Sequence, residues 1–256
     1  MPLATSLTIV VCTADLVSSM SHLSAAIYPS SAAVYYALQN GAIRLYFPFL
    51  IALIAGLGLT AELDNRFFAN TRSRVGVKKR LKQQVIRVVA WTFGVFSGIA
   101  FVKVLIAFLV IPRLMPHVIN SHVYAATEEA IQALSENQSP LTATLRAGLP
   151  IFAITTAVWN GVSASAFALL TVVSVVLIKN RVLAILLPAV IYVGESIWTQ
   201  LIGLPGASYL GAAIYPAGLQ DYPLGQSVLA LVGVILVSGI AFAWIVKIST
   251  RNQRFA

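Results

Sequence analysis

The stretch Glu62–Arg87 reads ELDNRFFANTRSRVGVKKRLKQQVIR, and it is the one strongly polar segment set between long apolar runs. It holds eight of the seventeen Lys and Arg residues of the chain. Basic residues beside membrane spans are retained on the cytoplasmic side. We therefore predict that this stretch is a cytoplasmic loop between two membrane-spanning helices, and that it sets the topology of the whole chain.

The composition is that of a membrane protein. Of the 256 residues, 59% are hydrophobic and 10% are charged, whereas about 25% charged residues is typical of soluble domains. We predict an all-α polytopic membrane protein that forms a single transmembrane domain over residues 1–256. The net charge of +9 gathers in short segments beside apolar runs, which favours positive-inside bias and contact with anionic lipid headgroups over nucleic-acid binding.

Six apolar runs approach the length of about 20 residues that a spanning helix needs. The first is diluted by Asp15, and a cleaved signal peptide is the competing interpretation. No Lys or Arg precedes this run, whereas a signal peptide normally begins with a basic segment. The predicted spans are residues 3–20, 45–61, 85–111, 151–178, 182–202 and 228–246, with a cytoplasmic coupling loop at 62–84.

Six spans place both termini and the basic loop on the same side. Thirteen of the seventeen basic residues then lie there, and only Arg44, Arg113 and Arg146 lie on the other side. The sequence therefore predicts a multi-pass protein of a bacterial cell membrane with cytoplasmic termini. Its outer segments include 112–150, where Thr127 is expected to begin a short amphipathic helix. Before the last span, 203–225 is rich in proline and predicts short re-entrant helices.

The basic loop divides at Gly76 into two halves of different character. In the first half, Phe67 and Phe68 stand among charged residues. Lipid contact alone explains adjacent aromatic residues in a charged segment poorly, so docking onto a soluble protein is the preferred interpretation. After Gly76 the basic residues run into the next span, where long basic side chains extend to the headgroups as a lipid-anchoring collar.

The loop resembles the cytosolic loop between the second and third spans of ABC-2-type ABC transporter permeases, in particular the compact bacterial members with six spans. Two further resemblances are the junction of the fourth and fifth spans and the proline-rich outer segment before the last span. The order of these features over nearly the whole chain carries the resemblance. The matching stretches are Glu62–Asp64, Phe67–Phe68, Asn70–Val75, Leu177–Arg181, Leu186–Pro188 and Tyr215–Pro216.

The resemblance implies a transmembrane permease subunit of an ATP-driven exporter. Two permease copies, identical or different, would form the substrate path, and a dimer of cytosolic ABC ATPases would bind ATP and Mg and drive it. The loop would form a coupling helix that sits in a groove on the ATPase and transmits its closure to the spans. The implied coupling residues are Glu62, Asp64, Arg66, Phe67, Phe68, Arg72 and Arg74.

Three ionisable residues lie inside predicted spans, namely Asp15, Lys103 and Glu195. Such residues are functional candidates because a charge inside the membrane is costly. Substrate contact is one interpretation, and a buried Glu–Lys or Asp–Lys pair with a structural role is the other. The small residues of Asn160–Ala166 predict close packing of the fourth span against a neighbour.

The sequence predicts neither an enzyme nor a metal site. It has no GxxxxGK[ST] nucleotide-binding loop, so ATP hydrolysis would come from a partner and the chain itself would hold no cofactor. His117 and His122 are five apart, which is a poor spacing for one helical face. The alternative function is an ion- or proton-coupled secondary transporter or channel that uses Asp15, Lys103 or Glu195. That class predicts broken helices and internal repeats, and the two halves show no convincing repeat.

Overall fold

The computed structural model describes residues 2–39, 43–64, 77–120, 127, 129–131, 141–204, 207–214 and 223–252. Throughout these ranges the regular secondary structure is helical, and one isolated bridge joins Tyr28 to Ile119. The predicted all-α class is therefore confirmed for the described part of the chain.

Five helical segments are long and apolar enough to cross a membrane. These segments agree with a multi-pass membrane protein, and they correspond to five of the six predicted spans. The remaining predicted span, 45–61, lies in α3 (Ile43–Asp64), whose described apolar portion Tyr46–Thr60 is shorter. The five segments are Leu3–Leu23, Leu81–Leu114, Leu149–Leu177, Arg181–Leu201 and Leu224–Ile245.

Several of the long helices extend beyond the predicted span limits. The predicted third span, 85–111, lies in a run of consecutive helical segments that comprises α5 (Val77–Leu105), the π-helical segment η1 (Ile106–Val110) and α6 (Ile111–Leu114). The other helices are α1 (Pro2–Leu23), α2 (Ser31–Gln39), α8 (Leu149–Leu177), α9 (Arg181–Leu201), α10 (Tyr209–Ile214) and α11 (Leu224–Asn252), with 3-10 turns at Pro116–Val118 and Thr142–Ala147.

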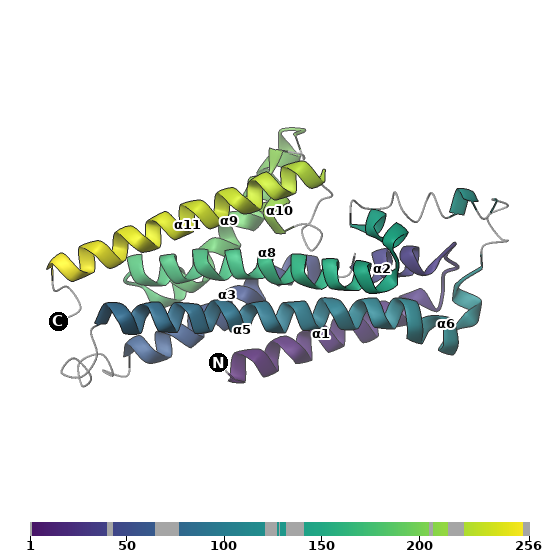
Figure 1. The fold of residues 1–256 in the computed structure, drawn as a ribbon, viewed down its shortest axis with the longest axis horizontal. Helices are drawn as coiled ribbons and strands as arrows, with labels where there is room; N and C mark the ends of the chain where they lie inside the picture. The colour runs from purple at the N-terminus through teal and green to yellow at the C-terminus, as the bar shows by residue number, and fades with distance from the viewer. Residues whose placement is uncertain are drawn as a thin grey trace.

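The helices form an elongated bundle in which α8 is central and contacts α3, α5, α9 and α11 (Figure 1). The prediction of close packing by the small residues of the fourth span is confirmed on α8. A Cβ atom at Gly161 would lie 2.1 Å from Oγ of Ser97 and 2.8 Å from the ring of Phe93. Further along, the Ser165 hydroxyl donates a hydrogen bond of 3.3 Å to the carbonyl of Val89. The backbones of α5 and α8 therefore approach closely and run antiparallel.

The short helix α2 lies between the first two predicted spans, in a stretch for which no helix was predicted. Val34 and Leu38 are fully buried, and the ring of Tyr35 packs edge-on to Phe152 of α8 at 5.3 Å. A helix of nine residues is marginal by itself, so its stability comes from packing. The stretch is too short to show the apolar pattern by which the longer helices were predicted from the sequence.

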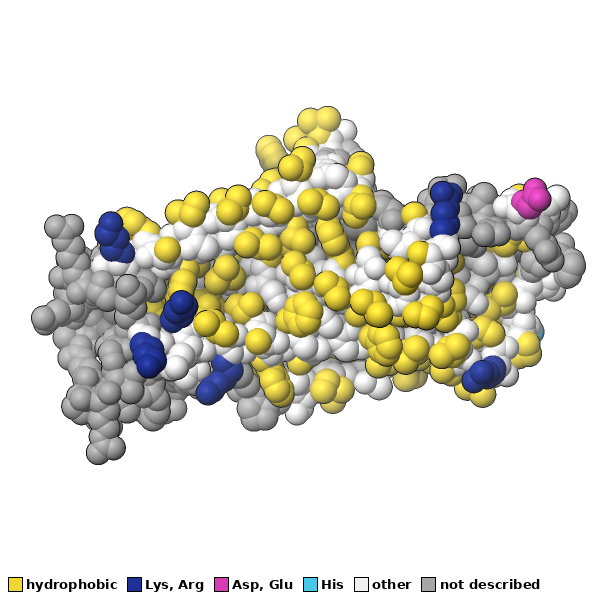
Figure 2. Space-filling view, in the orientation of Figure 1, with side chains coloured by type: hydrophobic (Ala, Val, Ile, Leu, Met, Phe, Trp, Pro, Cys, Tyr) yellow, Lys and Arg dark blue, Asp and Glu magenta, His cyan; other side chains and the backbone are white. Residues whose placement is uncertain are grey.

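Charged and apolar side chains are separated along the bundle. Figure 1 places the end of α3, the start of α5, the α8–α9 turn and the end of α11 at one end of the molecule. On the face drawn in Figure 2, Lys and Arg lie toward the two ends, and the surface between them is dominated by hydrophobic side chains. Lys79, Lys82, Lys179 and Lys247 are exposed. An apolar waist between charged ends is the pattern that a lipid bilayer requires.

Candidate functional site

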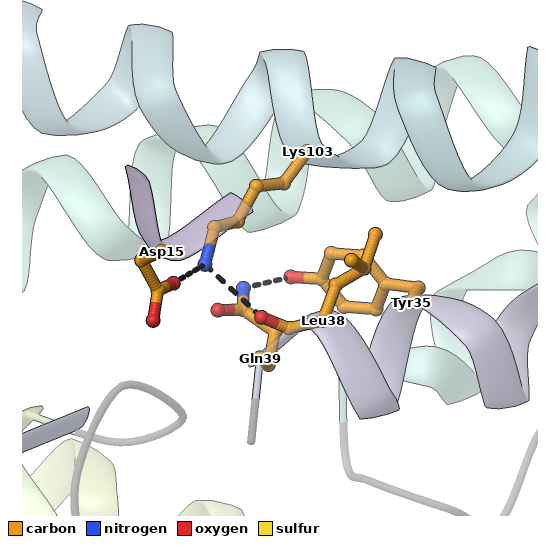
Figure 3. Close-up of polar contacts among 5 residues, drawn as sticks. All are labelled: Asp15, Tyr35, Leu38, Gln39 and Lys103. Atoms are coloured by element: carbon orange, nitrogen blue, oxygen red, sulfur yellow. Dashed lines mark hydrogen bonds and ion pairs between the residues drawn. The ribbon is translucent and has the colours of Figure 1, made fainter. Parts of the chain in front are cut away.

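A charge pair lies between α1 and α5 (Figure 3). Nζ of Lys103 is 3.6 Å from Oδ2 of Asp15, and the two side chains are 5% and 7% exposed. The sequence allowed an Asp–Lys pair as one interpretation of these residues, and the structure brings them together. Removing one partner from a buried pair leaves an uncompensated charge, so the two side chains depend on each other.

The end of α2 completes this site. Nζ of Lys103 donates a hydrogen bond of 3.1 Å to the carbonyl of Leu38, in the last turn of α2. The final carbonyls of a helix lack intrahelical partners and carry partial negative charge, so a lysine ammonium is well placed there. Next to it, Nε2 of Gln39 donates to Oη of Tyr35 at 2.5 Å. One ammonium thus joins three helices, as Figure 3 shows.

The pair lies deep in the apolar part of the bundle. Asp15 is eight residues from the end of α1 at Leu23, and Lys103 is eleven residues from the end of α6 at Leu114. At a rise of 1.5 Å per residue these separations are about 12 and 16 Å. A hydrocarbon core is about 30 Å thick, so helices that cross a bilayer from end to end would place both residues near its middle. The carboxylate and the carbonyl together reduce the cost of placing an ammonium there.

A small cavity adjoins the pair on its protein side. Its volume is about 20 Å³, and its lining includes Cys12, Gln39, Lys103 and Asn160. A cavity of this size holds about one water molecule, and the polar side chains in its wall would bind it. Asn160 also donates a hydrogen bond of 2.8 Å to the carbonyl of Thr156, which fixes its amide within α8.

Glu195 lies on α9 and takes part in a different contact. Its Oε1 accepts a hydrogen bond from the backbone N–H of Tyr209, and its Oε2 accepts one of 3.0 Å from the N–H of Leu210. These are the first two residues of α10, where a carboxylate is favoured by the exposed N–H groups and the helix dipole. Glu195 therefore caps α10, whereas Lys103 forms its ion pair with Asp15.

The predicted coupling residues fall mostly outside the described part of the chain. Glu62 and Asp64 belong to the last turn of α3, and their side chains are not described. Arg66, Phe67, Phe68, Arg72 and Arg74 lie outside the described residues. Within the predicted loop, 62–84, residues 62–64 belong to α3 and residues 77–84 belong to α5.

Three residues of this site, Tyr35, Leu38 and Gln39, were not predicted from the sequence. Tyr35 and Gln39 are four residues apart, a spacing that allows two polar side chains to meet on one face of a helix. That signal was present but unspecific. The Leu38 contribution is a backbone carbonyl, which no side-chain pattern reveals. In the described ranges no group of three or more His, Cys, Asp or Glu residues is arranged to hold a metal ion.

Comparison with known proteins finds no matching family model, no matching curated protein and no matching solved structure. The function of the chain is therefore inferred from its own residues and their geometry.

Proposed function

We propose that this chain is the transmembrane permease subunit of an ATP-driven ABC exporter of the ABC-2 type. In this proposal it lies in a bacterial cell membrane with both termini cytoplasmic, and a separate cytosolic ATPase drives it. One observation carries the proposal. The helix α3 ends at Asp64, and α5 begins at Val77, at the end of the bundle where the α8–α9 turn and the end of α11 also lie (Figure 1). A partner bound there would contact the ends of most of the long helices.

The packing of α5 supports a lever mechanism. This helix and the segments that follow it run from Val77 to Leu114, and α5 packs against α8, whose backbone approaches closely at Gly161. On its other side, Nε1 of Trp91 donates a hydrogen bond of 2.8 Å to the hydroxyl of Thr5 in α1. A displacement applied at 65–76 would move α5 and α8 together, because closely packed helices shift as rigid bodies, and the Trp91–Thr5 hydrogen bond connects α5 to α1.

The region before the last span supports the proposed outer re-entrant element. The six residues of α10 extend about 9 Å, far too short to cross a membrane. From Gly211 to Ile214 its residues are buried against the bundle. Glu195 satisfies its first N–H groups. A re-entrant element at membrane depth is tolerated where protein covers it, and the burial of Gly211–Ile214 agrees with this requirement. The proposed architecture therefore has six spans, with α3 as the second.

The partners in this proposal are a dimer of ABC ATPases and a second permease copy. ATP and Mg would bind to the ATPase. The described part of the chain exposes many large apolar side chains on the outside of the bundle, among them Leu229, Ile240 and Trp244. Lipids and the second permease would share this surface.

The test is purification of the full chain together with the product of a neighbouring ATPase gene. We expect an ATPase to co-purify with the wild-type chain and to be lost when Phe67 and Phe68 are both replaced by alanine. The matched control is Phe101→Ala with Trp244→Ala, which removes two exposed aromatic side chains from α5 and α11 and should keep the partner. Retention of the ATPase by the Phe67/Phe68 variant would overturn the docking assignment.

A second candidate function is ion- or proton-coupled transport through the charge pair. The observation in its favour is that Asp15 and Lys103 meet the end of a short helix deep in the bundle, as helix ends do in many secondary transporters. This candidate predicts that the purified chain alone moves protons or solute across liposomes, and that Lys103→Met abolishes this movement. Such activity without an ATPase would contradict the exporter proposal.

A further inference from the structure

A crevice runs between α1 and α5 on the side of the bundle that faces the surroundings. Its volume is about 380 Å³. Four of its residues on α1 recur at the spacing of one helical face, and the α5 residues extend from Gly94 to Lys103. Ile9, Gly98 and Val102 are exposed at its mouth, and Cys12 and Lys103 are buried at its floor.

Two glycines on α5 make the crevice hollow. A Cβ atom built at Gly94 or at Gly98 would meet no other atom within 4 Å. The two residues are four apart and therefore lie above one another on the same face of α5. Side chains at these positions would fill the space, so their absence keeps it open. By contrast, the space beside Gly161 on α8 is already filled by the side chains of Ser97 and Phe93.

The lining is almost entirely apolar. Thr13 is one of its few polar residues, and its hydroxyl donates a hydrogen bond of 2.8 Å to the carbonyl of Ile9. The ammonium of Lys103 is directed to Asp15 and the Leu38 carbonyl. Lys103 therefore contributes mainly the hydrocarbon part of its side chain to the lining of the crevice. Water needs two to four polar partners to remain in a cavity. The crevice is therefore unsuited to water, and an unfilled space of this size is unfavourable in a packed protein.

The dimensions select the shape of the occupant. The α1 residues of the lining span seven positions from Ile9 to Leu16 and the α5 residues span nine from Gly94 to Lys103, which correspond to about 10 and 14 Å of helix. A volume of about 380 Å³ spread over such a length gives a mean cross-section of roughly 30 Å². A crevice of this length and section has room for a single hydrocarbon chain.

We propose that the crevice between α1 and α5 binds one hydrocarbon tail of a membrane lipid. Its mouth is continuous with the exposed apolar side chains of Ile9 and Val102, and it lies at the depth of the acyl chains, because Lys103 is about 16 Å from the outer end of its helix. The tail supplies the packing atoms between α1 and α5 that Gly94 and Gly98 do not. The inference requires only that α1 and α5 cross a membrane, and it is independent of the exporter proposal.

Photo-crosslinking tests this site. The full chain is reconstituted in nanodiscs of a phosphatidylcholine that carries a diazirine in its acyl chain, irradiated, and mapped by peptide mass spectrometry. We expect adducts to concentrate between Ile9 and Leu16 and between Gly94 and Val102, several times above the exposed face of α11. Gly94→Leu with Gly98→Leu should lower the adduct yield at Ile9–Leu16 by about fivefold or more, because the two side chains take the space of the tail.

The control is Gly239→Leu on α11, where a Cβ atom also meets no neighbour and where no crevice residue lies. It should leave the adduct pattern unchanged. Thermal unfolding of each variant shows that the fold is retained, and the single variant Gly98→Leu serves as a second test with a smaller change. An adduct yield that is unchanged in the filled variants would overturn the site. So would the absence of lipid adducts at the crevice of the wild-type chain, which is the result expected if a second copy of the chain covers it.

Discussion

Lys103 of α5 holds the middle of α1 and the end of α2 at once, since its ammonium is 3.6 Å from the carboxylate of Asp15 and 3.1 Å from the carbonyl of Leu38. These contacts connect α5 to both helices, and the hydrogen bond from Trp91 to Thr5 is a second polar link between α5 and α1. In a bilayer, where water does not compete, such a connection fixes the relative positions of the helices strongly. It also joins the crevice to the interior, because Lys103 lines both cavities.

Breaking this pair should destabilise the protein, and removing it whole should not. We expect Lys103→Met or Asp15→Val alone to cost about 3–5 kcal/mol, because each leaves a buried charge without its main counter-charge. The double variant should recover most of that loss. Thermal unfolding in detergent measures the order of the midpoints, with Lys82→Met, an exposed lysine on α5, as control. A double variant no more stable than the single variants would contradict this assignment.

Glu195 should stabilise α10 locally. Glu195→Ala removes the acceptors of the Tyr209 and Leu210 amides, and loss of a helix cap costs about 1 kcal/mol, roughly a fivefold increase in local opening. Hydrogen exchange of Tyr209–Ile214 should therefore become faster, and less so in Glu195→Gln, which keeps one acceptor oxygen. Gln200→Ala, an exposed change on α9, should have no effect. Equal exchange in all three variants would show that the cap is not needed.

The contact of α8 with α5 should not tolerate a side chain at Gly161. Gly161→Leu places atoms where Phe93 and Ser97 already lie, and overpacking of this kind costs about 1–3 kcal/mol. We expect a lower unfolding midpoint and a lower yield of folded protein. Gly194→Leu on α9, where a Cβ atom meets nothing within 4 Å, is the matched control. If both variants unfold at the wild-type temperature, the two helices have more freedom than the structure shows.

The two charged ends should lie on opposite sides of the membrane. Single cysteines are introduced at Lys79, Lys247, Arg113 or Arg146, all exposed, in a Cys12→Ser background that removes the single native thiol. In intact cells a membrane-impermeant maleimide should label only the variants at Arg113 and Arg146, because Lys and Arg beside spans are retained inside. Labelling at Lys79 in intact cells would invert the proposed topology.

Much of the helical framework was predictable from the sequence. Runs of apolar residues locate helices reliably, since a spanning segment must satisfy all its backbone hydrogen bonds internally. The predicted spans 151–178 and 182–202 agree within a few residues with α8 and α9. The turn between them was also predictable, because asparagine is a favourable residue at the start of a helix. In the structure the side chain of Asn180 accepts a hydrogen bond of 3.2 Å from the N–H of Leu183.

The helix α2 was not predictable, and neither were the contacts that it makes. Its nine residues are fewer than a span needs, and their helical state depends on burial of Val34, Tyr35 and Leu38 against other helices. For Glu195 the sequence suggested a charged partner or a substrate. The partners in the structure are backbone N–H groups of α10, which exist in every residue except proline and leave no mark in the sequence.

By itself, the sequence determined that this protein is built of apolar helices and that its basic residues gather beside them, because hydrophobicity and charge act locally along the chain. Only the tertiary structure decided that Asp15 meets Lys103, that Leu38 contributes a carbonyl, and that Gly94 and Gly98 open a crevice. These relationships join residues far apart in the chain. They depend on how the helices pack, and the periodicity of a single helix carries no information about its neighbours.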